Sequence, residues 1–290
     1  MSQYTSAAAS ATKEFRARVV RPLVRSELLL WLAIALFANQ AIQLLSFDSL
    51  STFVESLTNQ NYVFWFGCYV TLYRLARSEL RSPSKSDWIF AITILLALLA
   101  ASFVGYRFSI GVIATVFAFY LLLDRADREL KAASTVLLAL SAHLFWGPIV
   151  FQYFTPELLR ADAALVGGML KVVRPDIVWN DTTFYTTPDF AISLVGACSS
   201  FHNLSTALLA CVAATMFMRT EWAQRDIPRL LAAIVSMILM NDARLCLLAW
   251  SPSAYAFWHN GAGAPLLALL MTATLLVIAF WGAAPRSGRA

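Results

Sequence analysis

Charged residues are scarce in this chain: they make up 13% of its 290 residues, whereas hydrophobic residues make up 59%. The hydrophobic residues occur in long runs, without the alternating or amphipathic spacing of soluble strands and helices. This composition excludes an ordinary soluble domain. The four cysteines do not form a disulfide framework, and there is no CxxC or HExxH spacing. We therefore expect no metal site and no other cofactor.

Eight apolar segments are long enough to be membrane spans, because a hydrocarbon core of ~30 Å requires about 20 residues of helix. They cover residues 28–47, 57–75, 88–104, 108–123, 132–154, 194–218, 230–250 and 264–281. Residues 105–107 alone separate the third segment from the fourth, which predicts a tight helical hairpin. We predict an all-α polytopic membrane protein of about eight transmembrane helices.

The basic residues predict the orientation of these spans, since loops rich in Lys and Arg stay on the cytoplasmic side. With the N-terminus inside, every inner segment is basic, and the inner segments hold 17 of the 22 Lys and Arg residues. These are Lys13, Arg16, Arg18, Arg21, Arg25, Arg74, Arg77, Arg81, Lys85, Arg125, Arg128, Lys131, Arg219, Arg225, Arg229, Arg286 and Arg289. Both chain ends are then cytoplasmic (N-in/C-in). Membrane orientation accounts for the net charge of +5, so we expect no nucleic-acid partner.

The spans divide the chain into four parts. Residues 1–27 form a basic cytoplasmic tail, because no short apolar core with a cleavage site follows them as in a targeting peptide. Residues 28–154 form a five-span N-terminal membrane half, and residues 194–290 form a three-span core. Between them, residues 155–193 form an extracytoplasmic insertion, far longer than the other loops.

The insertion carries two different patterns. Its first half has apolar residues at helical spacing with charged residues among them, which predicts an amphipathic helix lying on the outer membrane surface. The apolar residues are Leu158, Leu159, Leu165, Val166, Met169, Leu170 and Val173, and the charged ones are Glu157, Arg160 and Asp162. Its second half, between Pro175 and Pro188, has a strand-turn-strand pattern centred on Asn180 and Asp181. That pattern predicts a small β-hairpin; the alternative is a lid or an irregular loop.

An ionisable residue inside a span tends to persist only where it functions or is paired, and Arg244 is the strongest case here. It lies six residues before Trp250, so it is ~9 Å inside the outer end of its helix. Asn241 lies three residues earlier on the same helical face. The alternative is an arginine that reaches the lipid headgroups or pairs with Asp242.

A thiol and an imidazole are predicted at the same depth as Arg244. Cys198 lies near the outer end of the sixth span, and His259 lies just before the eighth. In such an arrangement an imidazole accepts the thiol proton, the thiolate attacks a carbonyl, and a fixed cation stabilises the oxyanion. Two alternatives stay open: Cys246 as the nucleophile or as a disulfide partner of Cys198, and His202 as the base.

The remaining cysteines and histidine lie deep within spans or toward the cytoplasmic side. They are Cys68, Cys211 and His143. We predict that they are core residues.

Three short motifs give the chain a resemblance to the exosortase/archaeosortase family of membrane transpeptidases and proteases. Ala197-Cys198-Ser199 matches the family's catalytic cysteine motif, although Ser200 replaces a glycine. Asn241-Asp242-Ala243-Arg244 matches its Asn-x-x-Arg element, and His259 with Gly263 matches its histidine followed by glycine. The order and spacing of the motifs agree with the family over about the last hundred residues.

The resemblance implies a multi-pass thiol protease or transpeptidase of the cell inner (plasma) membrane, with its active site on the extracytoplasmic side. Its partners would be the lipid bilayer and exported proteins that carry a C-terminal sorting signal: a short PEP-CTERM-like motif, a transmembrane helix and a basic tail. Cys198 would be the nucleophile, His259 the base and Arg244 the oxyanion ligand, with Asn241, Ser199 and Gly263 in support. Residues 194–290 would then be the catalytic core.

Substrate contacts are predicted for Trp179, Tyr185 and His202. The hairpin that we expect at residues 177–185 could bind an extended substrate segment by strand addition.

Three alternatives come from other classes of function. A transporter would place ionisable groups near the bilayer midplane, whereas the polar groups here gather toward one surface. A non-catalytic assembly factor for surface-polymer export would tolerate loss of Cys198. A membrane acyl- or glycosyltransferase would need an acidic or His-centred site, which the sequence does not show.

Overall fold

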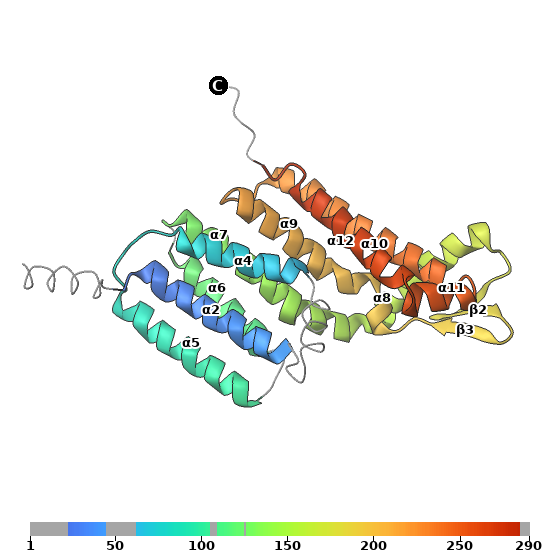
Figure 1. Cartoon of the computed structure of the whole chain (residues 1–290), viewed down its shortest axis with the longest axis horizontal. Helices are drawn as coiled ribbons and strands as arrows, with labels where there is room; N and C mark the ends of the chain where they lie inside the picture. Colours follow the sequence, from blue (N-terminus) through green and yellow to red (C-terminus); the bar gives the residue numbers. More distant parts are fainter. Residues whose placement is uncertain (1–22, 45–61, 105–108, 125, 285–290) are drawn as a thin grey trace, which may run out of the picture.

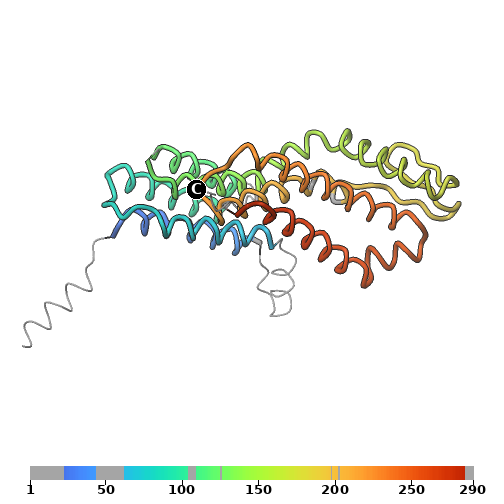
Figure 2. The backbone as a smooth tube through the Cα atoms, turned by 90° about the horizontal axis from the view of Figure 1, so that it is seen from above, coloured from blue at the N-terminus to red at the C-terminus, as the bar shows by residue number. Residues whose placement is uncertain are grey.

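The computed structural model describes residues 23–44, 62–104, 109–124 and 126–284 of the chain as an elongated helical bundle with a small β-sheet at one end (Figure 1). The same elongated outline is seen from above in Figure 2. Most of the predicted cytoplasmic tail and the link at 105–107 lie outside the described residues. The start of the second predicted span, at 57–61, lies outside them as well.

A helix overlaps each of the eight predicted spans, although several of the bounds differ. The helices are α2 (Arg25–Leu44), α4 (Tyr62–Ala76), α5 (Lys85–Val104), α6 (Ser109–Leu122), α7 (Arg128–Ser141) continued by α8 (Gly147–Val173), α9 (Leu204–Met218), α10 (Ile227–Leu248) and α12 (Gly263–Phe280). Five described segments, Arg25–Gln43, Lys85–Phe103, Arg128–Val173, Gln224–Leu248 and Gly263–Phe280, are long and apolar enough to cross a membrane. The chain is therefore a multi-pass helical membrane protein, and the count of eight spans with its orientation stays a prediction.

One helical stretch runs much further than a bilayer requires. From Arg128 to Val173 it contains 46 residues, with a five-residue π-helix, η1 (Ala142–Trp146), between α7 and α8. Pro148 is the second residue of α8, and a proline cannot donate the usual backbone hydrogen bond, which accounts for the widened turn before it. At ~1.5 Å per residue the stretch measures ~69 Å, more than twice the ~30 Å hydrocarbon core. Part of α8 therefore lies beyond the membrane.

This continuity corrects the prediction of a separate amphipathic helix on the membrane surface. Residues 155–173 belong to α8 and continue the fifth span through Pro156. Their apolar stripe packs against protein: Leu159, Val166 and Leu170 are buried in a second hydrophobic cluster with the end of α10 and the sheet. The amphipathic spacing is present, but Leu159, Val166 and Leu170 face the sheet and α10, whereas Leu165, Met169 and Val173 are exposed.

The predicted hairpin is confirmed and gains a third strand. Strand β1 (Val178–Asn180) pairs antiparallel with β2 (Thr183–Thr187), which pairs antiparallel with β3 (Phe190–Ser193). Asp181 in the turn has a φ of 53°, a left-handed conformation that Asp and Asn adopt more readily than most residues. On β2, Phe184 is fully buried toward α8, whereas Tyr185 is exposed on the other face.

Helices from both predicted halves of the membrane region contribute to the larger hydrophobic core. Helix α9 packs against α4 and α7 of the first half as well as α10 and α12 of the second. Ion pairs lie at the end of the bundle remote from the sheet, where Arg25 on α2 binds Asp87 at 2.8 Å and Asp124 at 2.5 Å. The ends of α2, α5 and α6 are thereby joined (Figure 1).

Candidate active site

The segment with Cys198 leaves the sheet and turns into the bundle before any long helix begins. Two short 3-10 helices, η2 (Gly196–Cys198) and η3 (Ser200–Asn203), connect β3 to α9. The α-helix of the sixth predicted span therefore begins at Leu204, ten residues after the predicted start at Leu194. Ser199 separates the two turns and caps η3, because its hydroxyl accepts a hydrogen bond from the Phe201 N–H at 3.3 Å. Cys198 itself is half-buried and packs against the second hydrophobic cluster.

Asp162 on α8 binds Ser199 and Ser200, the two residues that directly follow Cys198. We call residues 198–200 the cysteine turn. One of its carboxylate oxygens, Oδ2, accepts a hydrogen bond of 2.6 Å from the Ser199 hydroxyl and another of 3.0 Å from the Ser200 N–H. The Asp162 side chain is fully buried, as are those of both serines. Its second oxygen, Oδ1, has no partner among the described residues.

The adjacent residues Asn241 and Asp242 on α10 bind the turn from another side. The Ser200 hydroxyl donates to Asp242 Oδ1 at 2.8 Å. The Asn241 side-chain amide donates to the Cys198 carbonyl at 2.8 Å and to Ser200 Oγ at 3.0 Å. Both side chains of α10 are buried. Helices α8 and α10 are thus joined through the two serines that follow the cysteine.

Arg244 lies one helical turn after Asn241, on the same side of α10. Its side chain is half-buried, and within the described ranges it has no hydrogen-bond or ion-pair partner. It is not paired with Asp242, which binds Ser200 instead. A guanidinium without a described partner, one turn beyond the residue that binds the Cys198 carbonyl, is free to bind an anion or a developing oxyanion.

His259 lies in a second π-helix, η5 (Ala256–Asn260), which follows the short helix α11 (Pro252–Tyr255). Its imidazole is exposed and packs on the Tyr255 ring, with centroids 4.7 Å apart. Tyr255 and Trp258 pack against the same hydrophobic cluster as Cys198, so η5 and the cysteine turn lie at the same end of the bundle. No described hydrogen bond joins His259 to Cys198 or Arg244.

Gly263 is required where α12 passes the aromatic residues of η5. A Cβ at this position would lie 2.5 Å from Cε3 of Trp258 and 2.7 Å from Cε1 of Phe257. Real Cβ atoms essentially never approach other atoms so closely, so a larger residue would displace the rings that flank His259.

The other thiols and His143 are placed differently. Cys68 and Cys211 are buried core residues, as predicted. The Cys246 thiol contacts the Val166 carbonyl on α8 at 3.8 Å, and Cys198 and Cys246 form no disulfide. The prediction that His143 is a core residue is wrong. Its half-buried ring lines a cavity, because the π-helix η1 turns it toward α9, where Nδ1 hydrogen-bonds Ser205 Oγ at 3.0 Å.

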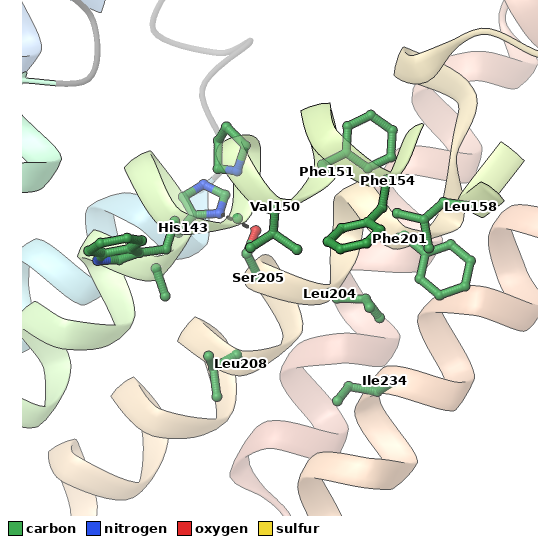
Figure 3. A pocket seen from close by; sticks show the side chains of 14 residues that line it. His143, Val150, Phe151, Phe154, Leu158, Phe201, Leu204, Ser205, Leu208 and Ile234 are labelled. Atoms are coloured by element: carbon green, nitrogen blue, oxygen red, sulfur yellow. Dashed lines mark hydrogen bonds between the residues drawn. The ribbon is translucent and has the colours of Figure 1, made fainter. Parts of the chain in front are cut away.

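That cavity has a volume of about 450 Å³. It adjoins the cysteine turn, residues 198–200. Figure 3 shows the His143–Ser205 pair at one side and Phe154, Leu158 and Phe201 at the other. Phe201 belongs to η3, three residues after Cys198, and the lining is otherwise almost entirely apolar. The cavity is suited to an apolar group.

The three predicted substrate contacts differ in their surroundings. Trp179 is half-buried, and its ring packs against Gly167 of α8. The Lys171 ammonium lies 4.8 Å from the centroid of the Trp179 ring. Tyr185 is 48% exposed on the other face of the sheet. His202 belongs to η3, but its side chain lies outside the described part of the chain.

Sequence reasoning missed Asp162 and the bridging role of Ser200. In the sequence, Asp162 is only one of the charged residues among the apolar positions of the predicted amphipathic helix. It lies three residues after Leu159 and four before Val166, on the buried stripe itself. A charged residue on an apolar stripe was the available signal.

The family comparison agrees with the motifs. A model of the transmembrane exosortase family matches residues 54–278, which is more than half of the chain. The matched range includes the cysteine turn, Asn241, Arg244, His259 and Gly263. No curated protein and no solved structure matches the chain.

Proposed function

This chain belongs to the transmembrane exosortase family, and on that premise we propose that it is a cysteine transpeptidase or protease that cleaves C-terminal sorting signals of exported proteins. The family supports a membrane transpeptidase-type function in general. The cysteine chemistry, the extracytoplasmic side of the inner membrane and the PEP-CTERM-like signal are parts of the proposal.

One observation carries the proposal: the cysteine turn is held from two helices by buried hydrogen bonds, while a partnerless arginine lies one turn beyond the residue that binds the Cys198 carbonyl. A structural cysteine would need no such fixed turn. A nucleophile needs it, since small errors in placement slow a reaction strongly.

In the proposed reaction His259 takes the proton of the Cys198 thiol, and the thiolate attacks the scissile carbonyl carbon. Arg244 stabilises the oxyanion that forms. The C–N bond then breaks, and the leaving amine receives the proton from His259. An acceptor amine or water attacks the thioester and gives its proton to His259. The C–S bond breaks and the thiol is regenerated. His259 must approach Cys198 when substrate binds, because no described hydrogen bond joins them.

Two features of the fold support the proposed substrate binding: the free edge of β3 among the described residues and the apolar cavity. Strand β3 ends at Ser193, five residues before Cys198, and its outer edge pairs with no other strand among the described residues. A substrate segment added along β3 would run toward the thiol. The apolar cavity beside Phe201 suits an apolar part of the substrate, as a sorting signal with a transmembrane helix would supply.

The experiment that tests this function replaces Cys198 by alanine. The full chain is expressed with a co-encoded exported protein that ends in a short motif, an apolar helix and a basic tail, and the size and membrane retention of that reporter are measured on a gel. Cys246→Ala and Arg160→Ala are matched controls: the first removes the alternative nucleophile, and the second removes an arginine that is 61% exposed on the outer part of α8.

We expect the Cys198→Ala and Arg244→Ala variants to accumulate at the wild-type level and leave the reporter uncleaved, while both controls process it. Processing by Cys198→Ala together with loss of processing in Cys246→Ala would assign the nucleophile to Cys246. Processing by every variant would contradict cysteine catalysis and favour the assembly-factor alternative.

A further inference from the structure

Two buried carboxylates hold the turn that carries Cys198, and the proposed reaction does not use either of them. Asp162 is 0% exposed and Asp242 is 1% exposed. We propose that both are positioning residues of the Cys198 site, and that Asp242 acts through the hydroxyl of Ser200. The proposal rests on the proposed function, in which Cys198 is the nucleophile.

The hydrogen bonds all run from the turn to the carboxylates. Asp162 accepts from the Ser199 hydroxyl and the Ser200 N–H, and Asp242 accepts from the Ser200 hydroxyl. Hydrogen bonds to a charged acceptor are stronger than neutral ones and fix their donors more firmly. Two consecutive residues after the cysteine are therefore tied to α8 and α10.

The fold alone gives no reason to keep two carboxylates here. A buried charge has a large desolvation cost, and apolar residues of similar volume often stabilise a fold as well or better. Asp162 Oδ1 and Asp242 Oδ2 have no partner in the described part of the chain, so part of that cost is not offset. Buried polar groups that persist at a cost are typical of functional sites.

Ser200 is the point at which the two carboxylates meet. Its N–H binds Asp162, its hydroxyl donates to Asp242, and the same hydroxyl oxygen accepts from Asn241. This is also the position at which the chain departs from the glycine of the family motif. A glycine here would keep the bond to Asp162 but leave Asp242 without any described partner, so the two positions should depend on each other.

The test measures kcat and KM for the full-length protein in detergent, with the reporter described above as substrate. Asp162→Ala should lower kcat about 100-fold, the loss typical of a displaced reacting group, with KM within about twofold. Asp162→Asn should stay within about tenfold of wild type, because an amide oxygen can accept the same two hydrogen bonds. Rescue by this conservative variant separates positioning from general stability. Glu221→Gln, at an exposed ion pair with Arg128 outside the sheet and the cysteine turn, is the control and should be unchanged.

A double-mutant cycle tests the link through Ser200. Ser200→Gly should lower kcat about tenfold, the effect of losing a hydrogen bond to a charged group. If Asp242 acts only through that hydroxyl, Ser200→Gly/Asp242→Asn should be no slower than Ser200→Gly alone. If the two substitutions lower kcat independently, so that the double variant shows the product of both effects, Asp242 does not act through Ser200. If Asp162→Ala does not accumulate, wild-type KM with a reduced kcat in Ser200→Gly still supports the proposal.

The Cys198→Ala variant distinguishes a failure of the positioning proposal from a failure of the proposed function. If it is inactive while Asp162→Ala and Ser200→Gly keep the wild-type kcat, the positioning proposal is wrong and the cysteine mechanism stands. If Cys198→Ala still cleaves the reporter, the proposed function fails, and the positioning proposal fails with it.

Discussion

Asn241 donates a hydrogen bond of 2.8 Å from its side-chain amide to the carbonyl oxygen of Cys198. The bond ties the backbone of the proposed nucleophile to α10, the helix that carries Arg244 one turn later. The distance between the thiol and the guanidinium therefore depends on this amide. The Asn-x-x-Arg spacing places the residue that holds the cysteine backbone and the cation of the site on one side of one helix.

Asn241→Ala should lower kcat about tenfold, because it leaves the Cys198 carbonyl without its partner and loosens the turn. An unpaired buried polar group costs about 1–3 kcal/mol, so a lower melting temperature should accompany the loss. Kinetics with the reporter and thermal unfolding in detergent measure the two effects. Asn39→Ala is the control, because it removes a side-chain amide that binds the Leu98 carbonyl between α2 and α5, away from the cysteine turn. A wild-type kcat in Asn241→Ala would show that the bond is dispensable.

Gly263→Ala should disturb His259 without touching it. The added methyl would overlap the rings of Phe257 and Trp258, the two residues that precede the histidine in η5. We expect kcat to fall about tenfold or more, since displacing a proton-transfer group reduces its contribution, which is typically 10²–10⁴-fold. Gly168→Ala on α8 is a matched control, because a Cβ there meets no atom within 4 Å. Equal activity of both variants would contradict this explanation for Gly263.

The cavity beside η3 should bind an apolar part of the substrate. Leu158→Trp would place a larger side chain into its lining, so KM should rise about tenfold while kcat changes little. Leu165→Trp makes the same change on the exposed face of the same helix, at a side chain that is 48% exposed. A KM that rises equally in both variants would point to a general effect of the tryptophan on α8.

The sheet should contribute to KM through its exposed residue. Tyr185→Ala should raise KM more than it lowers kcat if an extended substrate segment binds along the sheet. Trp179→Ala is expected to raise KM as well, but Trp179 covers Gly167 and contacts Lys171, so the melting temperature should fall too. Measuring both variants separates binding from packing. An unchanged KM in Tyr185→Ala would count against strand addition.

Local patterns predicted the elements better than they predicted the site. Long apolar runs located the helices, and the Asn180-Asp181 turn between β-forming residues located the hairpin, because both signals are contained in neighbouring residues. The third strand was missed, since β3 forms only by pairing with β2.

The buried partners of the cysteine turn could not be predicted in the same way. Asp162 is separated from Ser199 by 37 residues, and only the packing of α8 against η3 brings them together. Whether an aspartate on an amphipathic helix faces solvent or a serine hydroxyl depends on that packing. The same holds for His143, which a widened turn rotates out of the predicted core into the cavity lining.

Stability should depend on pH at the opposite end of the bundle, through Asp124. Burial by itself would raise the pKa of this carboxyl, but the hydrogen bond from Arg25, the backbone N–H of Ala126 and the charge of Arg81 lower it overall. Because the pKa is lower in the folded state than in the unfolded state, the stabilisation is fully present above the unfolded value of ~3.9 and is lost as the pH falls through the folded value. Asp124→Asn should therefore melt at a lower temperature than wild type at pH 7, and this difference in melting temperature should narrow below about pH 4.

Glu221→Gln is the control, because Glu221 belongs to an exposed pair with Arg128 at 3.6 Å, and such pairs contribute little. A difference between Asp124→Asn and wild type that stays constant from pH 7 to pH 3 would mean that the carboxylate charge does not stabilise this end of the bundle.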